Sequence, residues 1–292
     1  MARRYDTISV LTDYGTDDEF AGVLHAVIRD LAPDAAVIDL THGVAPFDVR
    51  GGSLALARAI AYVPVGVVLA IVDPGVATDR RAIAVEVADG DGVLIGPDNG
   101  LLAPAVALAG GAQRAVELTN VEYQLAAPGA TFAGRDVFAP AAAHVCNGVE
   151  LTEFGPLLDV DLLMPGVVPL VQADEQRVIA QVLWVDRFGN AQLNVAPDDL
   201  ADTFGERVEV HIEHPTAGAV TRSARRVRAF AELGGGEIGL VLDSTGLLAL
   251  VLDQRSAAAE LELAPGDQLT LVPGDPDNDR GITQPVGTPT RR

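Results

Sequence analysis

The chain has 292 residues, of which 49% are hydrophobic, and its 41 acidic and 20 basic residues give a formal net charge of −21. Such a negative surface repels nucleic acid and anionic lipid, so both are poor candidates as partners. No apolar run approaches the roughly 20 residues that a membrane span needs. The N-terminus passes directly into a strand instead of a signal peptide, so we expect a soluble, cytoplasmic protein.

The basic residues are all arginine, and the chain contains no lysine. The excess of acidic over basic residues predicts a salt-adapted protein. At molar ionic strength charges interact over only about 3 Å, so salt removes most of the repulsion between the acidic side chains. The single cysteine, Cys146, excludes an internal disulfide and a metal site built on cysteine.

Strands alternate with helices in the first part of the chain. The predicted strands are residues 8–11, 36–40, 67–72, 82–87 and 93–95, and helices are expected after residues 19, 50, 100 and 136. This order predicts an N-terminal α/β domain, residues 1–165, with a mainly parallel central sheet. Thr16 and Glu19 match a capping box at the start of the first helix.

Two of these strands end in a carboxylate. Asp13 follows the first strand, and Asp73 ends the third strand immediately before a Pro-Gly turn, with Arg80 seven residues later. Ligands of open α/β sheets bind at the carboxyl ends of strands, so these residues are candidates for a site. The simpler alternative is that Asp73 caps its turn and Arg80 pairs with it on the surface.

The loop at residues 41–48 contains one histidine, His42, and one phenylalanine, Phe47. A single loop histidine is usually a polar surface residue, and we expect this for His42. His144 lies within the predicted helix 137–146 and is expected to be structural.

After residue 166 the chain consists of strands without helices. The predicted strands are residues 178–185, 208–212, 225–230, 238–242, 247–252 and 268–272. Gly, Pro and Asp separate them at intervals typical of a small antiparallel β-barrel, which we place at residues 175–273. Residues 274–292 are polar and rich in Gly and Pro, which predicts a disordered tail.

Six motifs together resemble one family in order and spacing over most of the chain. They are Leu11-Thr12-Asp13-Tyr14-Gly15, Val72-Asp73-Pro74-Gly75-Val76 with Arg80, Gly96-Pro97-Asp98-Asn99-Gly100, Thr131-Phe132 with Gly134-Arg135-Asp136, Asp186-Arg187-Phe188-Gly189-Asn190, and Asp243-Ser244-Thr245-Gly246. The family is the S-adenosylmethionine hydroxide adenosyltransferases, relatives of the fluorinase and chlorinase.

The resemblance implies that water attacks C5′ of S-adenosylmethionine and releases adenosine and methionine, with no cofactor and no metal. Asp73 and Arg80 would position the water, and Asp13 would accept both hydroxyl hydrogens of the ribose. The resemblance also implies a homotrimer, with each active site between the N-terminal domain of one subunit and the barrel of its neighbour.

The barrel would bind the amino-acid end of the substrate. By resemblance, Asp186 and Asn190 would bind the methionine ammonium group, and Ser244, followed by Thr245, would bind the carboxylate.

Three phenylalanines complete the implied site. Phe188 and Phe230 would face the adenine, and Phe47 would lie near the ribose. Packing is an equally good interpretation of all three, since a phenylalanine beside Gly or Ala in a barrel is ordinarily a core residue.

Two alternative functions stay open at this point. Halogenases of the family carry a tyrosine at the position of Asp73, so a chlorinase is the enzymatic alternative, although the fluorinase insertion after this strand is absent. The family's Thr-Phe-His-Gly-Arg-Asp motif has Ala133 in place of its histidine. This departure leaves a weakly catalytic S-adenosylmethionine-binding protein as the second alternative.

Overall fold

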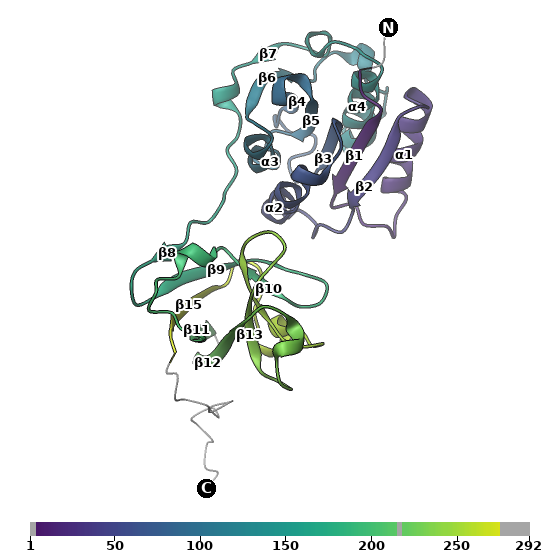
Figure 1. The fold of residues 1–292 in the computed structure, drawn as a ribbon. Helices are drawn as coiled ribbons and strands as arrows, with labels where there is room; N and C mark the ends of the chain where they lie inside the picture. Colours follow the sequence, from purple (N-terminus) through teal and green to yellow (C-terminus); the bar gives the residue numbers. More distant parts are fainter. Residues whose placement is uncertain (1–3, 215–217, 275–292) are drawn as a thin grey trace. The chain divides into compact units, whose positions relative to one another are not determined.

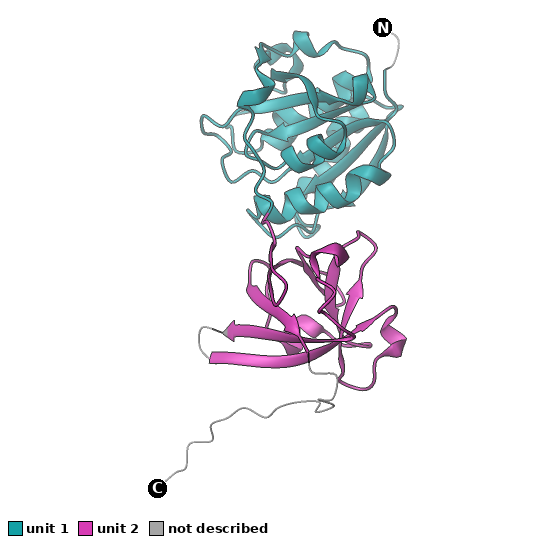
Figure 2. Cartoon of the chain, turned by 60° about the vertical axis from the view of Figure 1, so that its left-hand side comes forward, with its two compact units in different colours: residues 1–168 teal, residues 169–292 magenta. Residues whose placement is uncertain are grey.

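The computed structural model describes residues 4–214 and 218–274 (Figure 1). The chain divides into two compact units, residues 1–168 and residues 169–292 (Figure 2). The predicted disordered tail, residues 274–292, lies outside the described residues from residue 275 onward.

Unit 1 contains a seven-stranded sheet in the order β2-β1-β3-β5-β4-β6-β7. Its strands are β1 (Thr7–Thr12), β2 (Ala36–Thr41), β3 (Gly66–Ile71), β4 (Ala82–Val87), β5 (Gly92–Pro97), β6 (Ala112–Glu117) and β7 (Leu157–Leu158). Strands β2, β1, β3, β5 and β6 run in one direction, and β4 and β7 run in the opposite direction. The predicted α/β class with a largely parallel sheet is therefore confirmed.

Helices cover both faces of this sheet. They are α1 (Phe20–Leu31), α2 (Val49–Ala59), α3 (Ala103–Leu108) and α4 (Ala139–Cys146), with α1 packed against α4 and α2 against α3 (Figure 1). Along β3, Val67 and Leu69 contribute to the core beneath α1 and α4, and Val68 and Ala70 contribute to the core beneath α2 and α3. A strand buried on both faces needs apolar residues at every position, which explains the continuous apolar run of β3.

The start of α1 differs from the prediction. The helix begins at Phe20, and its N-cap Glu19 makes no side-chain capping hydrogen bond, so the expected capping box of Thr16 and Glu19 is wrong. Burial of Leu24 and Ile28 in the core holds the helix in place instead.

Unit 2 is a barrel closed by seven strands. They are β9 (Val178–Val185), β10 (Ala191–Leu193), β11 (Arg207–His214), β12 (Gly218–Val227), β13 (Ile238–Leu242), β14 (Leu248–Val251) and β15 (Gln268–Pro273), and the short β8 (Gln172–Ala173) pairs with β9. Neighbouring strands are antiparallel except β12 and β13, which are parallel. The barrel prediction is confirmed, with this one parallel pair added.

One predicted strand of the barrel was misplaced. We expected a strand at residues 225–230, but β12 ends at Val227 and a short 3-10 helix begins at Phe230. Phe230 therefore lies in the connection between β12 and β13 and is half exposed, not in the barrel wall.

Within residues 4–214 and 218–274, no helix is both long enough and apolar enough to cross a membrane.

Candidate active site

The predicted site residues form two groups, one in each unit. Unit 1 contains Asp13, Phe47, Asp73 and Arg80, and unit 2 contains Asp186, Phe188, Asn190, Phe230, Ser244 and Thr245.

Asp73 and Arg80 form a buried ion pair at the end of β3. The register of β1 and β3 pairs Thr12 with Ile71, so Asp13 and Asp73 follow the ends of neighbouring parallel strands. Arg80 donates from Nε to Asp73 Oδ1 at 3.0 Å and from Nη2 to Oδ2. The side chains of Arg80 and Asp73 are only 11% and 6% exposed, so this is not the surface pair of the simpler interpretation.

Neighbouring groups hold this ion pair in place. The guanidinium carbon of Arg80 lies 5.3 Å from the ring centroid of Phe138, within the range of a cation–π contact. Asn99, from the Gly-Pro-Asp-Asn-Gly motif, donates its side-chain amide to the carbonyl of Val72 at 2.9 Å. The backbone immediately before Asp73 is therefore tied to the adjacent motif.

Tyr14 is a residue of this site that sequence reasoning missed. Burial raises the pKa of the Tyr14 hydroxyl, and the nearby carboxylates of Asp13 and Asp73 raise it further, while Arg80 opposes them. A neutral tyrosine hydroxyl in this place can donate a hydrogen bond. Tyr14 belongs to the motif Leu11-Thr12-Asp13-Tyr14-Gly15, but only the fold brings its side chain close to Asp73.

Gly134 explains how the Tyr14 hydroxyl fits. A Cβ atom at Gly134 would lie 2.2 Å from Tyr14 Oη, so only glycine leaves room for the hydroxyl. Gly134 begins a π-helical turn, Gly134–Phe138, and short π-helical segments occur frequently at functional sites. Ala133, which replaces the family histidine, directly precedes this turn and packs half-buried against the core.

Asp13 binds the backbone of Phe47. Asp13 Oδ2 accepts a hydrogen bond from the amide of Phe47 at 2.9 Å, which leaves Oδ1 available to a ligand. Phe47 has a φ of 69°, a left-handed conformation that is uncommon for a bulky residue, and the residue is 71% exposed. The Phe47 ring is therefore not a core residue of unit 1.

His42 is buried, in contrast to the expected surface position. Its Nδ1 lies 2.8 Å from the hydroxyl of Thr12, and its carbonyl accepts the amide of Gly15 at 2.8 Å. His42 therefore contacts both sides of the loop that contains Asp13 and Tyr14.

His144 conforms to the structural interpretation. It lies in α4 with its ring 5.1 Å from that of Tyr123, and burial lowers the pKa of its imidazole.

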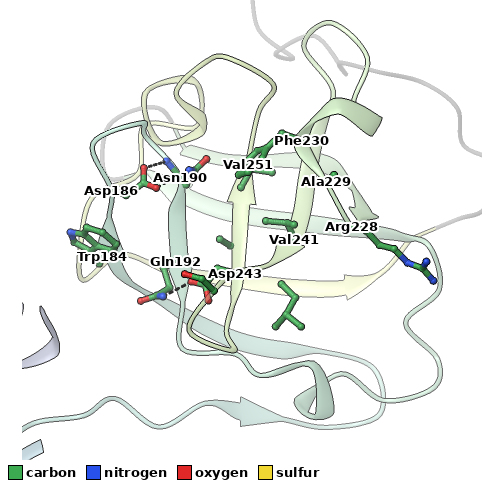
Figure 3. Close-up of a pocket in the computed structure, with 13 residues that line it drawn as sticks. Trp184, Asp186, Asn190, Gln192, Arg228, Ala229, Phe230, Val241, Asp243 and Val251 are labelled. Carbon is green, nitrogen blue, oxygen red and sulfur yellow. Dashed lines mark hydrogen bonds between the residues drawn. The ribbon is translucent and has the colours of Figure 1, made fainter. Parts of the chain in front are cut away.

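Four residues of the second group line a cavity of about 420 Å³ in the barrel (Figure 3). Asp186, Asn190, Phe230 and Ser244 are among its lining residues. Trp184, Gln192 and Asp243 also line it and were not predicted. The guanidinium of Arg228, at the rim, points away from the other labelled side chains in Figure 3.

Asp186 organises the loop after β9. Its Oδ1 accepts the amides of Phe188 and Asn190, both at 2.9 Å, and its Oδ2 accepts the side-chain amide of Asn190 at 2.7 Å. Three hydrogen bonds within one loop leave little of the carboxylate for a ligand, since its two oxygens offer about four acceptor positions.

Asp243 forms a polar network with two neighbours. Its carboxylate accepts hydrogen bonds from the amide and hydroxyl of Thr245, both at 2.8 Å, and from the side chain of Gln192, which also donates to Thr245 Oγ1 at 2.7 Å. Burial raises the pKa of the Asp243 carboxyl, but these hydrogen bonds outweigh it and hold the pKa below its ordinary value. Thr245 is thus engaged with the protein, and the neighbouring Ser244 lies exposed at the cavity.

Phe188 and Phe230 lie together at a second cavity of about 520 Å³, which also includes Asn190. Phe188 is 78% exposed and Phe230 is 44% exposed. Packing in the barrel core therefore does not account for either ring, because side chains in a core are nearly free of solvent contact.

Comparison with known families identifies both units. Residues 8–155 match the model of the SAM hydroxide adenosyltransferase N-terminal domain, and residues 180–270 match that of the corresponding C-terminal domain.

Individual relatives agree with these matches. The chain is 44% identical to the (R)-S-adenosyl-L-methionine hydrolase of Salinispora tropica, over 91% of this chain and 98% of that protein. It is 25% identical to the fluorinase of an Actinoplanes species, over 91% of this chain and 97% of that enzyme. Among solved structures, an uncharacterized conserved protein of Thermotoga maritima superimposes with a TM-score of 0.81 at 34% identity, covering 91% of this chain and 99% of that one.

Proposed function

The chain belongs to the SAM hydroxide adenosyltransferase family, which is related to the fluorinases, and we propose from this that it hydrolyses (R)-S-adenosyl-L-methionine to adenosine and L-methionine. The observation that carries the proposal is the buried Asp73–Arg80 pair at the end of β3, beside the carboxylate of Asp13. The rest of the substrate would bind to the groups in the barrel.

In the reacting step, a water oxygen forms a bond to C5′ while the bond from C5′ to sulfur breaks. The electron pair goes to the sulfonium sulfur, which leaves as the neutral thioether of methionine. Arg80 occupies one acceptor position on each Asp73 oxygen and fixes the plane of the carboxylate, so the remaining lone pairs can orient the water and receive its proton.

The proton leaves late in this mechanism. Free water, with a pKa of 15.7, and an ordinary carboxylic acid, with a pKa of about 3.9, differ by about 12 units, or roughly 16 kcal/mol. Because a carboxylate alone cannot form hydroxide at that cost, the positive charge of the leaving group must drive the reaction. The cationic sulfur loses its charge in the transition state, which an environment of low polarity favours.

Asp13 and Phe47 would bind the ribose. The Phe47 amide donates its hydrogen bond to Asp13 Oδ2, so Asp13 Oδ1 can accept the hydroxyl hydrogens of the ribose. The exposed Phe47 ring offers an apolar surface. Tyr14 would stay neutral and position Asp13 and Asp73 by contact.

The barrel would bind the two ends of the substrate. Ser244 and Asn190 present polar groups at the first cavity for the methionine carboxylate and ammonium, and Asp186 orients Asn190 and adds negative charge. Thr245 supports Ser244 through its bonds to Asp243. Phe188 and Phe230 offer exposed aromatic faces for the adenine.

We propose that the chain assembles into a homotrimer. In this trimer, unit 1 of one subunit would meet the barrel of its neighbour, and the two groups of residues would form one active site. Mixing an inactive unit 1 variant, Asp73→Asn, with an inactive barrel variant, Asn190→Ala, tests this arrangement. Shared sites predict that activity returns after subunit exchange, because some interfaces then contain two intact halves. Activity that stays absent in mixed oligomers, shown to be mixed by mass spectrometry, would contradict it.

Chloride is disfavoured as the nucleophile. A negative charge about 4 Å from chloride costs about 4 kcal/mol at an effective dielectric constant of about 20, unless the positive charge of Arg80 offsets it. The test is incubation with S-adenosylmethionine, with and without molar chloride, followed by chromatography. Adenosine under both conditions supports hydrolysis. A 5′-chloro nucleoside would establish a chlorinase, and intact substrate with measurable binding would establish a binding protein.

A further inference from the structure

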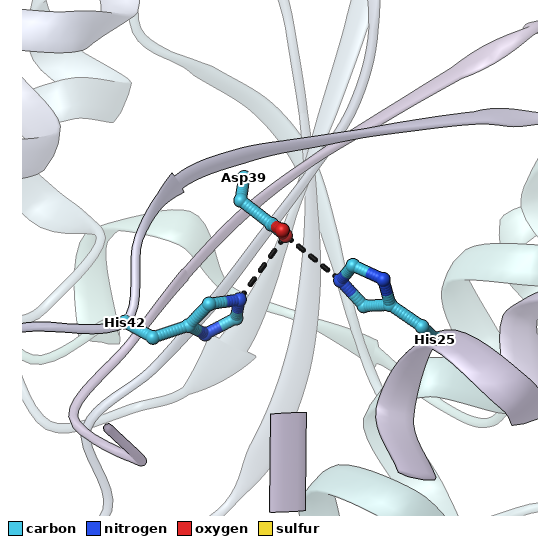
Figure 4. Close-up of side chains that lie close together, drawn as sticks. All are labelled: His25, Asp39 and His42. Carbon is cyan, nitrogen blue, oxygen red and sulfur yellow. Dashed lines mark hydrogen bonds and ion pairs between the residues drawn. The ribbon is translucent and has the colours of Figure 1, made fainter. Parts of the chain in front are cut away.

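Three side chains that are common metal ligands meet on unit 1. They are His25 from α1, Asp39 from β2, and His42 from the loop after β2, and their ligand atoms all lie within 4.8 Å of one another. Both imidazole rings point toward the Asp39 carboxylate (Figure 4). The Nε2 atoms of His25 and His42 lie 2.8 and 3.1 Å from Asp39 Oδ1.

His42 provides an independent sign that the cluster receives a ligand. The residue is nine-tenths buried, and its Nε2 lies within ion-pair distance of Asp39 but makes no well-formed hydrogen bond. Buried polar atoms are nearly always hydrogen-bonded, because a buried polar atom without a partner loses its hydration and gains nothing in exchange. A buried nitrogen that faces a carboxylate without a hydrogen bond is suited to bind a cation placed between them.

Thr12 can fix the ring of His42 in the form that binds metal. The Thr12 hydroxyl oxygen already accepts the amide of Tyr14 at 3.1 Å, and it lies 2.8 Å from His42 Nδ1. When Nδ1–H donates to this oxygen, Nε2 presents a lone pair to the cluster. Histidine ligands of metals commonly donate their second ring nitrogen to an oxygen in this way.

We propose that His25, Asp39 and His42 bind one divalent transition-metal ion of the zinc class. Two imidazoles and one carboxylate are ligands typical of Zn²⁺ sites that keep a position open for water. Zinc bound at about 2.1 Å to each ligand in a tetrahedron separates neighbouring donor atoms by roughly 3.4 Å. The cluster therefore has to open by a few tenths of an ångström. His25 and Asp39 can move, since their side chains are 39% and 43% exposed.

The surroundings favour a cation. The cluster lies in a cavity of about 490 Å³ that also includes Asp18 and Glu19. Their carboxylates add negative potential, and the space admits water as a further ligand. A bound ion would also brace the loop of Asp13 and Tyr14, because His42 is joined to Thr12 and Gly15.

The test uses the 292-residue chain without a histidine tag, stripped with EDTA and dialysed into buffer containing excess Mg²⁺ to saturate weak carboxylate sites. Co²⁺ reports the ligands by its visible absorption, and ZnCl₂ alone is titrated by calorimetry. The variants are His25→Gln and Asp39→Asn. His211→Gln is the control, since His211 is an exposed histidine of the barrel that lies 3.2 Å from Glu209.

We expect one Zn²⁺ per chain in the native protein and in the control, a saturable Co²⁺ spectrum, and a rise in melting temperature with Zn²⁺. Loss of a ligand should weaken Zn²⁺ binding at least about tenfold in both cluster variants. Even the loss of a residue that only hydrogen-bonds a metal ligand typically lowers metal affinity by that factor. Absence of stoichiometric binding in the native protein, or equal affinity in the cluster variants and the control, would overturn the proposal. Circular dichroism of each variant separates a lost ligand from a lost fold.

Discussion

Asp73 and Arg80 are the two residues on which the proposed chemistry depends. Both are almost completely buried, so neither charge is solvated well by water, and each compensates the other through two hydrogen bonds. Removing one partner of a buried ion pair is costly, because it leaves the other charge unpaired. Arg80 therefore serves the fold and the proposed reaction at once.

The first prediction concerns the carboxylate. Asp73→Asn keeps the shape of the side chain but removes the proton acceptor, so we expect kcat to fall by a factor of about 10²–10⁴ while KM changes little. Asp79→Asn, in the same loop but exposed, is the matched control and should retain the native rate. Steady-state kinetics on folded fractions measure both, and native kcat in Asp73→Asn would refute the role.

At the scale of residues, the sequence predicts the candidate side chains whose position depends only on the strand that they directly follow. Asp13 and Asp73 were located as candidates because each directly follows an apolar strand. Tyr14, His42 and Gln192 were missed, because their surroundings arise from contacts between distant segments. The space for the Tyr14 hydroxyl, for example, exists only because Gly134 packs against it.

At the scale of elements, the π-helical turn before α4 connects the fold to the site. Gly134 begins this turn, and the hydroxyl of Tyr14 occupies the space beside it. The turn also contains the ion pair of Arg135 and Asp136, in which Arg135 Nε donates to Asp136 Oδ1 at 2.6 Å.

The second prediction therefore concerns Gly134→Ala. The new methyl group would displace Tyr14 from Asp73, so we expect a loss of about 1–3 kcal/mol in stability, as for other overpacked sites, together with reduced kcat. Gly22→Ala is the control: this helical glycine of α1 has open space around it, and alanine should stabilise the helix by up to about 1 kcal/mol. Urea unfolding and kinetics check both, and equal effects of the two changes would contradict the packing argument.

The third prediction concerns the polar network that ends β13. Because the folded-state pKa of Asp243 is lowered, its ionised form contributes stability above the ordinary carboxyl pKa, and that contribution is lost as pH falls through the folded value. Melting temperatures of the native chain and Asp243→Asn should differ most near neutral pH and converge below about pH 4. A difference that stays constant across this range would exclude the linkage.

The boundaries of a strand can be predicted from the sequence where its apolar residues form a continuous or strictly alternating run. Strands β4, β9 and β13 match the predicted ranges because each is a continuous or alternating apolar run. Strand β10 escaped prediction because it has only three residues. The capping box failed because a matching pair of residue types does not ensure that their side chains reach the helix backbone.

At the scale of the whole molecule, the acidic composition is the dominant feature. A net charge of −21 on 292 residues destabilises the compact state by self-repulsion, which salt screens. We propose on this basis that the protein is adapted to high salt.

The fourth prediction follows from this charge. The melting temperature should rise between dilute buffer and molar KCl, because screening then acts over about 3 Å. Differential scanning calorimetry measures it, with molar sorbitol as a control for general exclusion of cosolutes. A chain no more stable in molar KCl than in dilute buffer would argue against salt adaptation.

The order of strands and helices was sufficient to predict an α/β unit followed by a barrel, since the change in pattern near residue 166 is abrupt. Antiparallel pairing of β4 with β5 follows from their connection, residues 88–91, which is too short for a crossover helix. The parallel pairing of β12 and β13 depends on how the barrel closes, which local sequence does not determine.

The most direct measurement is single-turnover reaction of (R)-S-adenosyl-L-methionine in H₂¹⁸O, with mass spectrometry of all products. Attack on C5′ predicts adenosine that carries the heavy oxygen and unlabelled methionine, with formation strongly slowed in Asp73→Asn and normal in Asp79→Asn. Heavy oxygen in homoserine beside methylthioadenosine would show attack on a different carbon, and that result, or equal rates in the two variants, would contradict the account.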